Sequence, residues 1–210
     1  MNRFLDAKYR VDCLMQVLED AGFELEDPYS ITSLVLPDYI HYAAGATRMV
    51  VWDDENPDYV IKIALDAKSE KYNEHEVELY KAAVRAGLAE HFAWCTEMYH
   101  NGEKGIYVME YLDCDDEEID SESYEWGFSR YCAENDLNPQ EAGEEYEDAY
   151  WHSSEYEDLI LDWFRDKLAS SVVNKFDWFV DRYDINDIHS ANMGRRNGQL
   201  VLCDYAGYGW

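Results

Sequence analysis

Three strand-like runs follow one another between residues 34 and 65, and they constrain the fold more than any other feature of the chain. The runs VLPDYIHYA, TRMVVW and YVIKIAL are rich in β-branched and aromatic residues, which favour extended backbone. A short polar stretch, DDENPD, separates the second run from the third. Because so short a connection joins antiparallel neighbours, the sequence predicts a three-stranded antiparallel meander.

Helical patterns flank this meander. Apolar residues recur at helical spacing over residues 3–21, before Gly22, and again over residues 69–86, before Gly87. Glycine is the usual residue after a helix C-terminus. Two further strand-like runs, FAWCTEMYH and GIYVMEYL, surround the hairpin signal Asn101-Gly102. The predicted order is therefore helix, three strands, helix and two strands.

The second half of the chain begins with a strongly acidic segment. Residues 113–158 hold 18 Asp or Glu and one basic residue, Arg130. Aromatic residues are interleaved among these acids, so we expect partly packed helices with one acidic face. A long amphipathic helix is predicted from Glu155 to about Phe179, followed by a loop, a strand, an Asn197-Gly198 turn and a second strand.

The 210 residues carry a formal net charge of −29, from 46 acidic and 17 basic residues. Such a chain repels phosphate backbones, so direct nucleic-acid binding is disfavoured. The negative charge serves either to keep the chain soluble or to dock it on a basic protein partner, in the way that a mimic of nucleic acid binds. No apolar run approaches the roughly 20 residues of a membrane span. The charged start is unlike a secretory signal, and five scattered cysteines favour a reducing, cytoplasmic setting.

Phosphoryl transfer needs a cation on the nucleotide phosphates, oxygen ligands for magnesium and a carboxylate near the acceptor hydroxyl. Lys62 in the third strand-like run could face a cleft, or it could be an ordinary solvent-facing strand lysine. Glu76, at the start of the following helix, is a candidate partner for Lys62. Glu74 and Glu78 are rival candidates, and a solvated helix face is the alternative for all three. Gly45, between the first two strands, either approaches a phosphate or forms a plain hairpin turn.

The end of the chain offers ligands for a cation. Asp187 stands five residues before Asn192, and Asp204 follows an apolar strand after a short hairpin. Magnesium prefers carboxylate and amide oxygens, so these three residues predict a site for magnesium and phosphate. The alternative is that Asp187 and Asn192 form turns and that Asp204 ends a strand.

Together these segments resemble the protein-kinase-like superfamily, which includes protein kinases and aminoglycoside phosphotransferases. VIKIA resembles the third-strand lysine motif, and HEVELY resembles the helix that carries the paired glutamate. INDIHSAN (185–192) resembles the catalytic loop, DYAG (204–207) the DFG-type segment, and VMEYL (108–112) the hinge that contacts adenine. The resemblance covers about residues 34–112 and 155–207. It is especially marked for small kinase-like proteins of bacteriophages, which would place the chain in a host cytoplasm.

The resemblance implies an α+β, two-lobed protein-kinase-like fold. The N-lobe would be residues 1–112, with the N-terminal helix, a five-stranded antiparallel sheet, an αC-type helix and the hinge. The C-lobe would be residues 113–210, reduced and helical, with the acidic segment 113–158, the catalytic loop and the metal-binding DYAG segment. ATP and Mg²⁺ would be the cofactors.

The resemblance also implies roles for individual residues. Lys62 would hold the α- and β-phosphates, and Glu76 would orient Lys62. Asp187 would serve as the catalytic base or orient the acceptor, while Asn192 and Asp204 would bind magnesium. Further nucleotide contacts would come from Gly45 over the phosphates, from Met109 as gatekeeper and from the backbone of Glu110, Tyr111 and Leu112.

The sequence departs from the family pattern in several places. Ile185 and Asn186 replace the usual His-Arg or His-Gly, and the glycine loop is sparse. The chain stops at Trp210, without an activation segment, an APE motif or the helices that hold a peptide substrate. We therefore expect one of two functions. The first is an ATP- and magnesium-dependent phosphotransferase acting on a protein or small-molecule hydroxyl. The second is a catalytically weak or inactive kinase-like protein whose acidic face inhibits or sequesters a basic host partner.

Overall fold

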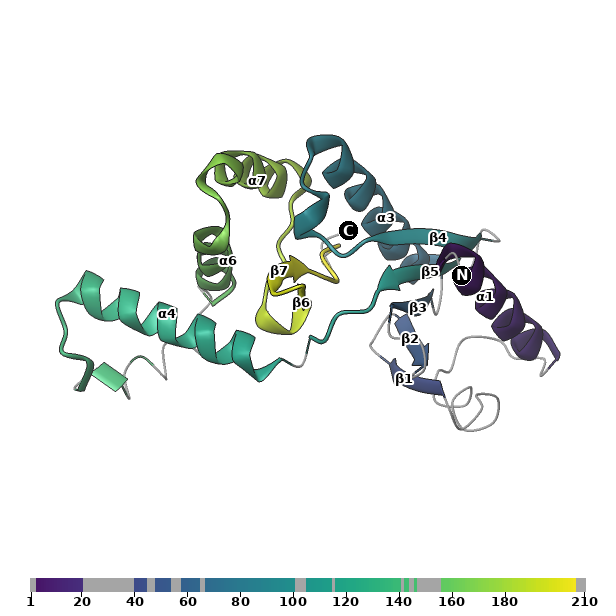
Figure 1. The fold of residues 1–210 in the computed structure, drawn as a ribbon, viewed down its shortest axis with the longest axis horizontal. Helices are drawn as coiled ribbons and strands as arrows, with labels where there is room; N and C mark the ends of the chain where they lie inside the picture. The colour runs from purple at the N-terminus through teal and green to yellow at the C-terminus, as the bar shows by residue number, and fades with distance from the viewer. Residues whose placement is uncertain are drawn as a thin grey trace. The chain divides into compact units, whose positions relative to one another are not determined.

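The computed structural model describes residues 3–20, 40–44, 48–53, 58–64, 67–100, 105–114, 116–140, 142–143, 146 and 156–206. The chain divides into two compact units, whose elements are labelled in Figure 1. Unit 1 is Met1–Ala82 with Ala93–Tyr111, and unit 2 is Ala83–Phe92 with Leu112–Trp210. The interpretation of these units as lobes of a kinase-like fold stays a prediction.

Unit 1 contains an antiparallel sheet with the strand order β1-β2-β3-β5-β4. Its strands are β1 (Ile40–Ala44), β2 (Arg48–Asp53), β3 (Tyr59–Ala64), β4 (Cys95–His100) and β5 (Gly105–Glu110). The predicted meander is confirmed, since β1 pairs with β2 and β2 pairs with β3. The later hairpin joins this meander through its second strand, β5, which pairs with β3 and leaves β4 at the edge.

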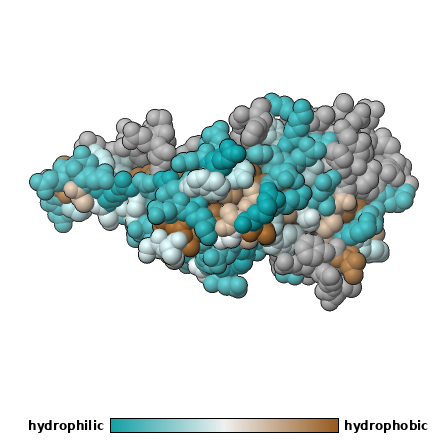
Figure 2. Space-filling view, turned by 90° about the horizontal axis from the view of Figure 1, so that it is seen from above, coloured by the Kyte–Doolittle hydropathy of each residue, from teal (hydrophilic) through white to brown (hydrophobic). Residues whose placement is uncertain are grey.

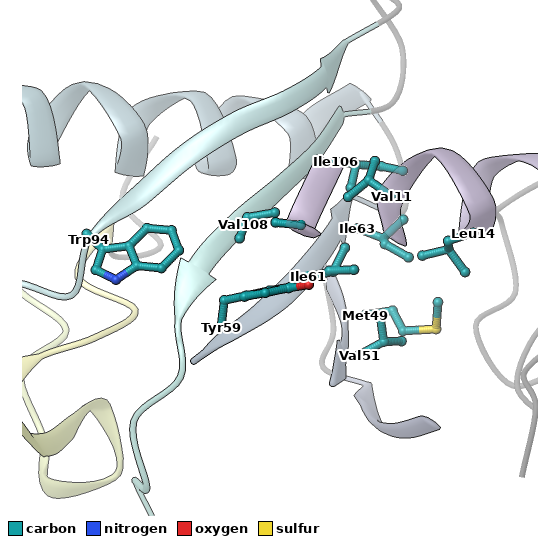
Figure 3. Close-up of a cluster of buried hydrophobic side chains, with 11 residues drawn as sticks. Val11, Leu14, Met49, Val51, Tyr59, Ile61, Ile63, Trp94, Ile106 and Val108 are labelled. Carbon is teal, nitrogen blue, oxygen red and sulfur yellow. The ribbon is translucent and has the colours of Figure 1, made fainter. Parts of the chain in front are cut away.

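Helix α1 (Arg3–Asp20) covers one face of this sheet with apolar side chains (Figure 3). Its buried residues Ala7, Val11 and Leu14 lie on one stripe of the helix, as helical spacing dictates. Strand residues that alternate along β2, β3 and β5 complete this core: Met49, Val51, Tyr59, Ile61, Ile63, Ile106 and Val108. The hydroxyl of Tyr59 also donates to Asp6 Oδ2 at 3.0 Å, which joins the sheet to α1 by a polar contact.

The opposite face of the sheet presents polar residues. Because side chains alternate along a strand, Arg48, Lys62 and Tyr107 point away from the α1 core, and the register places Lys62 directly opposite Tyr107. Helix α3 (Ala67–Ala86) supplies the polar side chains that accept hydrogen bonds from Arg48 and Lys62. The helix ends before Gly87, as predicted, and the φ of Gly87, 67°, is the left-handed conformation common after a helix C-terminus.

The prediction of a single long helix from Glu155 to about Phe179 is wrong. Unit 2 instead has α6 (Tyr156–Lys167) and α7 (Ser170–Tyr183), separated by an extended Ala169. Twelve residues of continuous helix would separate Phe164 from Phe176 by about 18 Å. The break instead brings the two rings to a centroid distance of 5.2 Å. Burial of this aromatic pair therefore outweighs the helical continuity that the local pattern indicated.

Aromatic side chains form the core of unit 2. Phe92 contacts Phe176, Phe179 and Tyr205, with ring centroids 5.1 to 6.1 Å apart. Helix α4 (Glu117–Asn135) adds a second group, in which Tyr146 contacts three rings of α4: Tyr124, Phe128 and Tyr131. The aromatics of the acidic segment are therefore packed in the part of it that the structure describes, as expected from their interleaving.

A short hairpin of β6 (Met193–Arg196) and β7 (Gln199–Leu202) follows the 3-10 turn η2 (Ser190–Asn192). Asn197 and Gly198 both have positive φ, 52° and 81°, as the predicted two-residue turn requires. Among the residues coloured in Figure 2, most on this face are hydrophilic, with small hydrophobic areas between them. Among the helices in the described ranges, none is long and apolar enough to cross a membrane.

Candidate functional site

Lys62 and Glu76 form a buried ion pair in unit 1. Lys62 Nζ donates to Glu76 Oε2 at 3.1 Å, and the two residues are 5% and 2% exposed. The alternative interpretation of Lys62 as a solvent-facing strand lysine is therefore wrong. Of the three glutamates left open by the sequence, Glu76 makes the contact, whereas Glu78 is exposed and pairs with Lys81 at 2.8 Å. Glu74 is also exposed.

A second cation, Arg48, contacts the same carboxylate. Arg48 Nη1 donates to Glu76 Oε2 at 3.1 Å and to Asn73 Oδ1 at 3.3 Å, and the residue is only 8% exposed. One carboxylate oxygen thus accepts hydrogen bonds from a lysine on β3 and an arginine at the start of β2. Sequence reasoning missed Arg48. The signal was its position two residues before Val50, the strand neighbour of Lys62, which places both cations on one sheet face.

The surroundings of this cluster are polar but shielded from water. Ser69, Asn73 and Glu76 are buried at helical spacing along α3, so they form one polar stripe facing the sheet. Tyr107, opposite Lys62 on β5, is also buried. Burial, and then the carboxylates of Glu97, Glu70 and Glu74, raise the pKa of Tyr107 far above its ordinary value. Its phenol therefore stays protonated at any physiological pH.

The segment predicted as the hinge is partly occupied by contacts within the protein. Met109 is buried at the end of β5, on the same sheet face as Lys62. The N–H of Glu110 donates to the Trp94 carbonyl at 2.8 Å, and the N–H of Tyr111 donates to the Asp58 carbonyl at 3.3 Å. Two of the backbone donors assigned to nucleotide contact are thus engaged in holding the segment in place. Gly45, the residue predicted to lie over the phosphates, falls outside the described residues.

In unit 2 the loop before β6 is organised by Asn192. Its side-chain Nδ2 donates to the Asp187 carbonyl at 2.9 Å, which closes the loop between the two residues. Its own carbonyl accepts from the Cys203 N–H at 2.9 Å, which extends the β6–β7 ladder by one step. Asp204 follows Cys203, so the hairpin places Asn192 beside the residue that precedes Asp204. The structure therefore gathers Asp187, Asn192 and the backbone leading to Asp204 in one small region.

The backbone of Asp204 is in the left-handed region. Four non-glycine residues in the described ranges have positive φ. Asp136 and Asp184 cap the C-termini of helices, and Asn197 lies in the hairpin turn. Asp204, at φ 51°, lies in the bend that leads from β7 into the turn at Tyr205 and Ala206. Asp is one of the few non-glycine residue types that adopt this conformation readily.

Two further contacts concern the acid groups of this region. His189 Nε2 lies 3.6 Å from Asp187 Oδ1, a contact that becomes an ion pair when His189 is protonated. Tyr205 and Ala206, the residues after Asp204, are buried, and the Tyr205 ring meets Phe92 edge to face at 5.1 Å. Asp204 is therefore fixed on one side by the hairpin and on the other by the aromatic core of unit 2.

The donor set of unit 2 fits magnesium in its chemistry. No group of three or more His, Cys, Asp or Glu side chains in the described ranges could hold a metal ion. Mg²⁺ bound with a nucleotide, however, takes only one or two protein carboxylates, and substrate phosphates and waters supply the rest. The nitrogen of the Asn192 carboxamide is directed at the Asp187 carbonyl, which leaves the amide oxygen as the acceptor. An amide oxygen and the Asp204 carboxylate are suitable ligands.

Comparisons with known proteins add little to this geometry. No protein-family model matches the sequence, and no curated protein sequence matches it. Among solved structures, one match is APH(2")-IIa in a ternary complex with streptomycin and ATP. It is 14% identical to this chain, and the match covers 85% of this chain and 68% of the other with a TM-score of 0.36. A TM-score of this size does not establish a shared fold, so function is inferred from the residues themselves.

Proposed function

We propose that this chain binds ATP together with Mg²⁺ and transfers the γ-phosphate to a hydroxyl of a protein or a small molecule. The observation that carries the proposal is the buried contact of Lys62 with Glu76 at 3.1 Å. Desolvation offsets most of the attraction within a buried ion pair, so such a pair contributes little to stability. A buried lysine and a buried arginine that share one glutamate oxygen are therefore better explained by function than by folding.

In this proposal the residues of unit 1 hold the nucleotide. Lys62 would contact the α- and β-phosphates, and Glu76 would keep the ammonium in position. An ammonium has three N–H donors, so Lys62 can contact Glu76 and a phosphate at the same time. Arg48 would orient the Glu76 carboxylate, because it donates to the same Oε2 atom.

The segment from Met109 to Leu112 would contact the base. The N–H groups of Glu110 and Tyr111 already donate to carbonyls within unit 1. Adenine would therefore be recognised through the carbonyl oxygens of the segment and the N–H of Leu112. Gly45 would approach the phosphates, as the resemblance to kinases implies.

The residues of unit 2 would serve the transfer itself. Asp204 and the amide oxygen of Asn192 would hold Mg²⁺, which when bound neutralises negative charge on the phosphate oxygens. Asp187 would accept the proton of the acceptor hydroxyl or orient that hydroxyl. The bond from the Asn192 side chain to the Asp187 carbonyl holds the Asn192 carboxamide against the backbone of Asp187, which would keep the ligand and the base close together.

Thermal melting with and without Mg-ATP tests this proposal. Ligand at 100 times its dissociation constant should stabilise the folded chain by about 2.7 kcal/mol. Lys62→Ala and Asp204→Asn should each reduce the shift, whereas Lys81→Ala, which removes an exposed lysine of α3, should leave it unchanged. An unchanged melting temperature of the wild-type chain at millimolar Mg-ATP would rule out the proposal.

The acidic surface favours a second candidate function. Five acidic residues of α4 are exposed, Glu117, Glu118, Asp120, Glu125 and Glu134, in a chain of net charge −29. In this alternative the chain is a catalytically weak or inactive kinase-like protein that sequesters a basic host protein. Association with a basic protein should then weaken strongly as salt rises. Binding that is insensitive to ionic strength would contradict this candidate.

A further inference from the structure

Two cysteines far apart in the sequence meet in unit 2. The sulfur atoms of Cys114 and Cys203 lie 2.7 Å apart, although 89 positions separate the two residues. A disulfide bond has a length of about 2.05 Å, so little movement separates the two thiols from bonding distance.

Residues before and after Cys114 in the sequence both contact β6, and these contacts fix the position of Cys114. Before it, the backbone at Leu112 and Asp113 packs on Gly194 of β6: a Cβ atom at Gly194 would lie 2.6 Å from Leu112 Cβ and 3.1 Å from the Asp113 carbonyl oxygen. This approach therefore depends on the missing side chain of Gly194. After it, Asp116 accepts a hydrogen bond from Arg195 Nε at 3.2 Å.

The same hairpin fixes Cys203. Met193 is paired with Leu202, and the N–H of Cys203 donates to the Asn192 carbonyl at 2.9 Å. Gly194 and Arg195 on β6 thus hold the irregular segment that carries Cys114, between β5 and α4, while Cys203 directly follows β7. The sulfur atoms are brought together by ordinary backbone pairing, packing and an ion pair, and the contact does not depend on a bond between them.

We propose that Cys114 and Cys203 form a reversible disulfide when the chain meets a small-molecule disulfide. Cys114 is half-buried and Cys203 is 7% exposed, so Cys114 is the thiol that an outside reagent reaches first. Its thiolate attacks one sulfur of the reagent and releases one small thiol, which leaves a mixed disulfide on Cys114. The Cys203 thiolate then attacks the Cys114 sulfur and releases the second small thiol. The two protein thiols lose two electrons and two protons, and the two released thiols carry them.

The charges near Cys114 favour a neutral oxidant over an anionic one. Asp113 is exposed beside Cys114 and Glu117 is exposed at the start of α4, whereas Asp116 is paired with Arg195. The carboxylates of Asp113 and Glu117 repel anionic reagents such as oxidised glutathione. A neutral disulfide should react faster than an anionic one, and raised salt should reduce the difference because it screens exposed charges.

The bond would be formed next to the candidate metal site. Cys203 directly precedes Asp204, and its N–H bonds the carbonyl of Asn192. Oxidation would therefore fix the backbone of the two residues proposed as magnesium ligands. That consequence rests on the proposed function, whereas formation of the disulfide does not.

Treatment of the reduced full-length chain with neutral hydroxyethyl disulfide tests the proposal. Denaturation, alkylation and peptide mapping then identify the cysteines that have escaped alkylation. Because pre-placed thiols react as an intramolecular pair, we expect a peptide that links Cys114 to Cys203, at least roughly tenfold in excess over any other pair. Dithiothreitol should abolish it.

Matched variants make the result specific. Cys114→Ser should abolish the linked peptide, and Cys13→Ser, which removes an exposed thiol of α1, should leave its yield unchanged. Full alkylation of Cys114 and Cys203 after oxidation would overturn the proposal. An equal yield of a peptide linked through another pair of cysteines in Cys114→Ser would also overturn it. Mass mapping of the denatured chain needs no Mg-ATP binding. A chain that forms this link but does not respond to Mg-ATP would therefore refute the proposed function and support the disulfide.

Discussion

Replacing Glu76 should destabilise the chain much more than replacing Lys62. Glu76 Oε2 accepts hydrogen bonds at 3.1 Å from both Lys62 and Arg48, and all three residues are buried. Glu76→Gln keeps the size of the side chain but removes the negative charge that both cations share. Breaking a buried ion pair in this way costs about 3–5 kcal/mol of unfolding free energy. Lys62→Met removes one cation and leaves Glu76 in contact with Arg48, so its cost should be about 1–2 kcal/mol.

Urea unfolding followed by circular dichroism measures this difference. Thermal unfolding measures it as well. In a domain of this size 1 kcal/mol shifts the melting temperature by about 2–4 °C, so Glu76→Gln should lower the melting temperature by about 6–20 °C. Glu78→Gln is the matched control, because Glu78 is an exposed residue of the same helix paired with Lys81. That substitution should change stability by less than about 1 kcal/mol. A loss in Lys62→Met equal to or larger than the loss in Glu76→Gln would refute the shared-carboxylate reasoning.

Three other predictions follow from unit 2. The disulfide between Cys114 and Cys203 closes a loop of 89 positions, so oxidation should raise the unfolding free energy by up to about 4.6 kcal/mol in the chain-entropy model, measured by urea unfolding. Gly194→Ala should lower the melting temperature because its Cβ would clash at 2.6 Å, whereas Gly143→Ala, with open space around it, should not. Burial lowers the pKa of His91. Its neutral form therefore stabilises the fold above the unfolded pKa of about 6.5, and stability should fall from about pH 7 to pH 5, less steeply in His91→Gln.

Local features of the fold were predictable from the sequence. The helix before Gly87 and the Asn197-Gly198 turn depend on residues close together in the chain, and the structure confirms both. The choice among Glu74, Glu76 and Glu78 is different. Residues two apart on a helix point about 200° apart, so burying Glu76 turns the other two outward. Only the rotation of α3 against the sheet, set by distant contacts, decides whether Glu76 faces the sheet or Glu74 and Glu78 do.

Contacts between distant segments could not be read from local patterns. Arg48 meets Glu76 across 28 positions and Cys114 meets Cys203 across 89, and both contacts depend on how strands are paired. The break at Ala169 was also missed, because the apolar spacing of the segment fits one long helix as well as two. The left-handed backbone of Asp204 was not predicted either, because Asp tolerates this conformation but does not require it.

The magnesium dependence of ATP binding tests the central claim most directly. Fluorescence anisotropy of a labelled ATP would be measured with the full chain in Mg²⁺ and in EDTA. The wild-type chain should bind at least roughly tenfold more tightly in Mg²⁺, a difference of about 1.4 kcal/mol. Asp204→Asn should lose this difference, and Asp184→Asn, at a residue with nearly the same φ in a helix cap, should keep it. Equal affinities in Mg²⁺ and EDTA, or an unchanged Mg²⁺ effect in Asp204→Asn, would contradict the account.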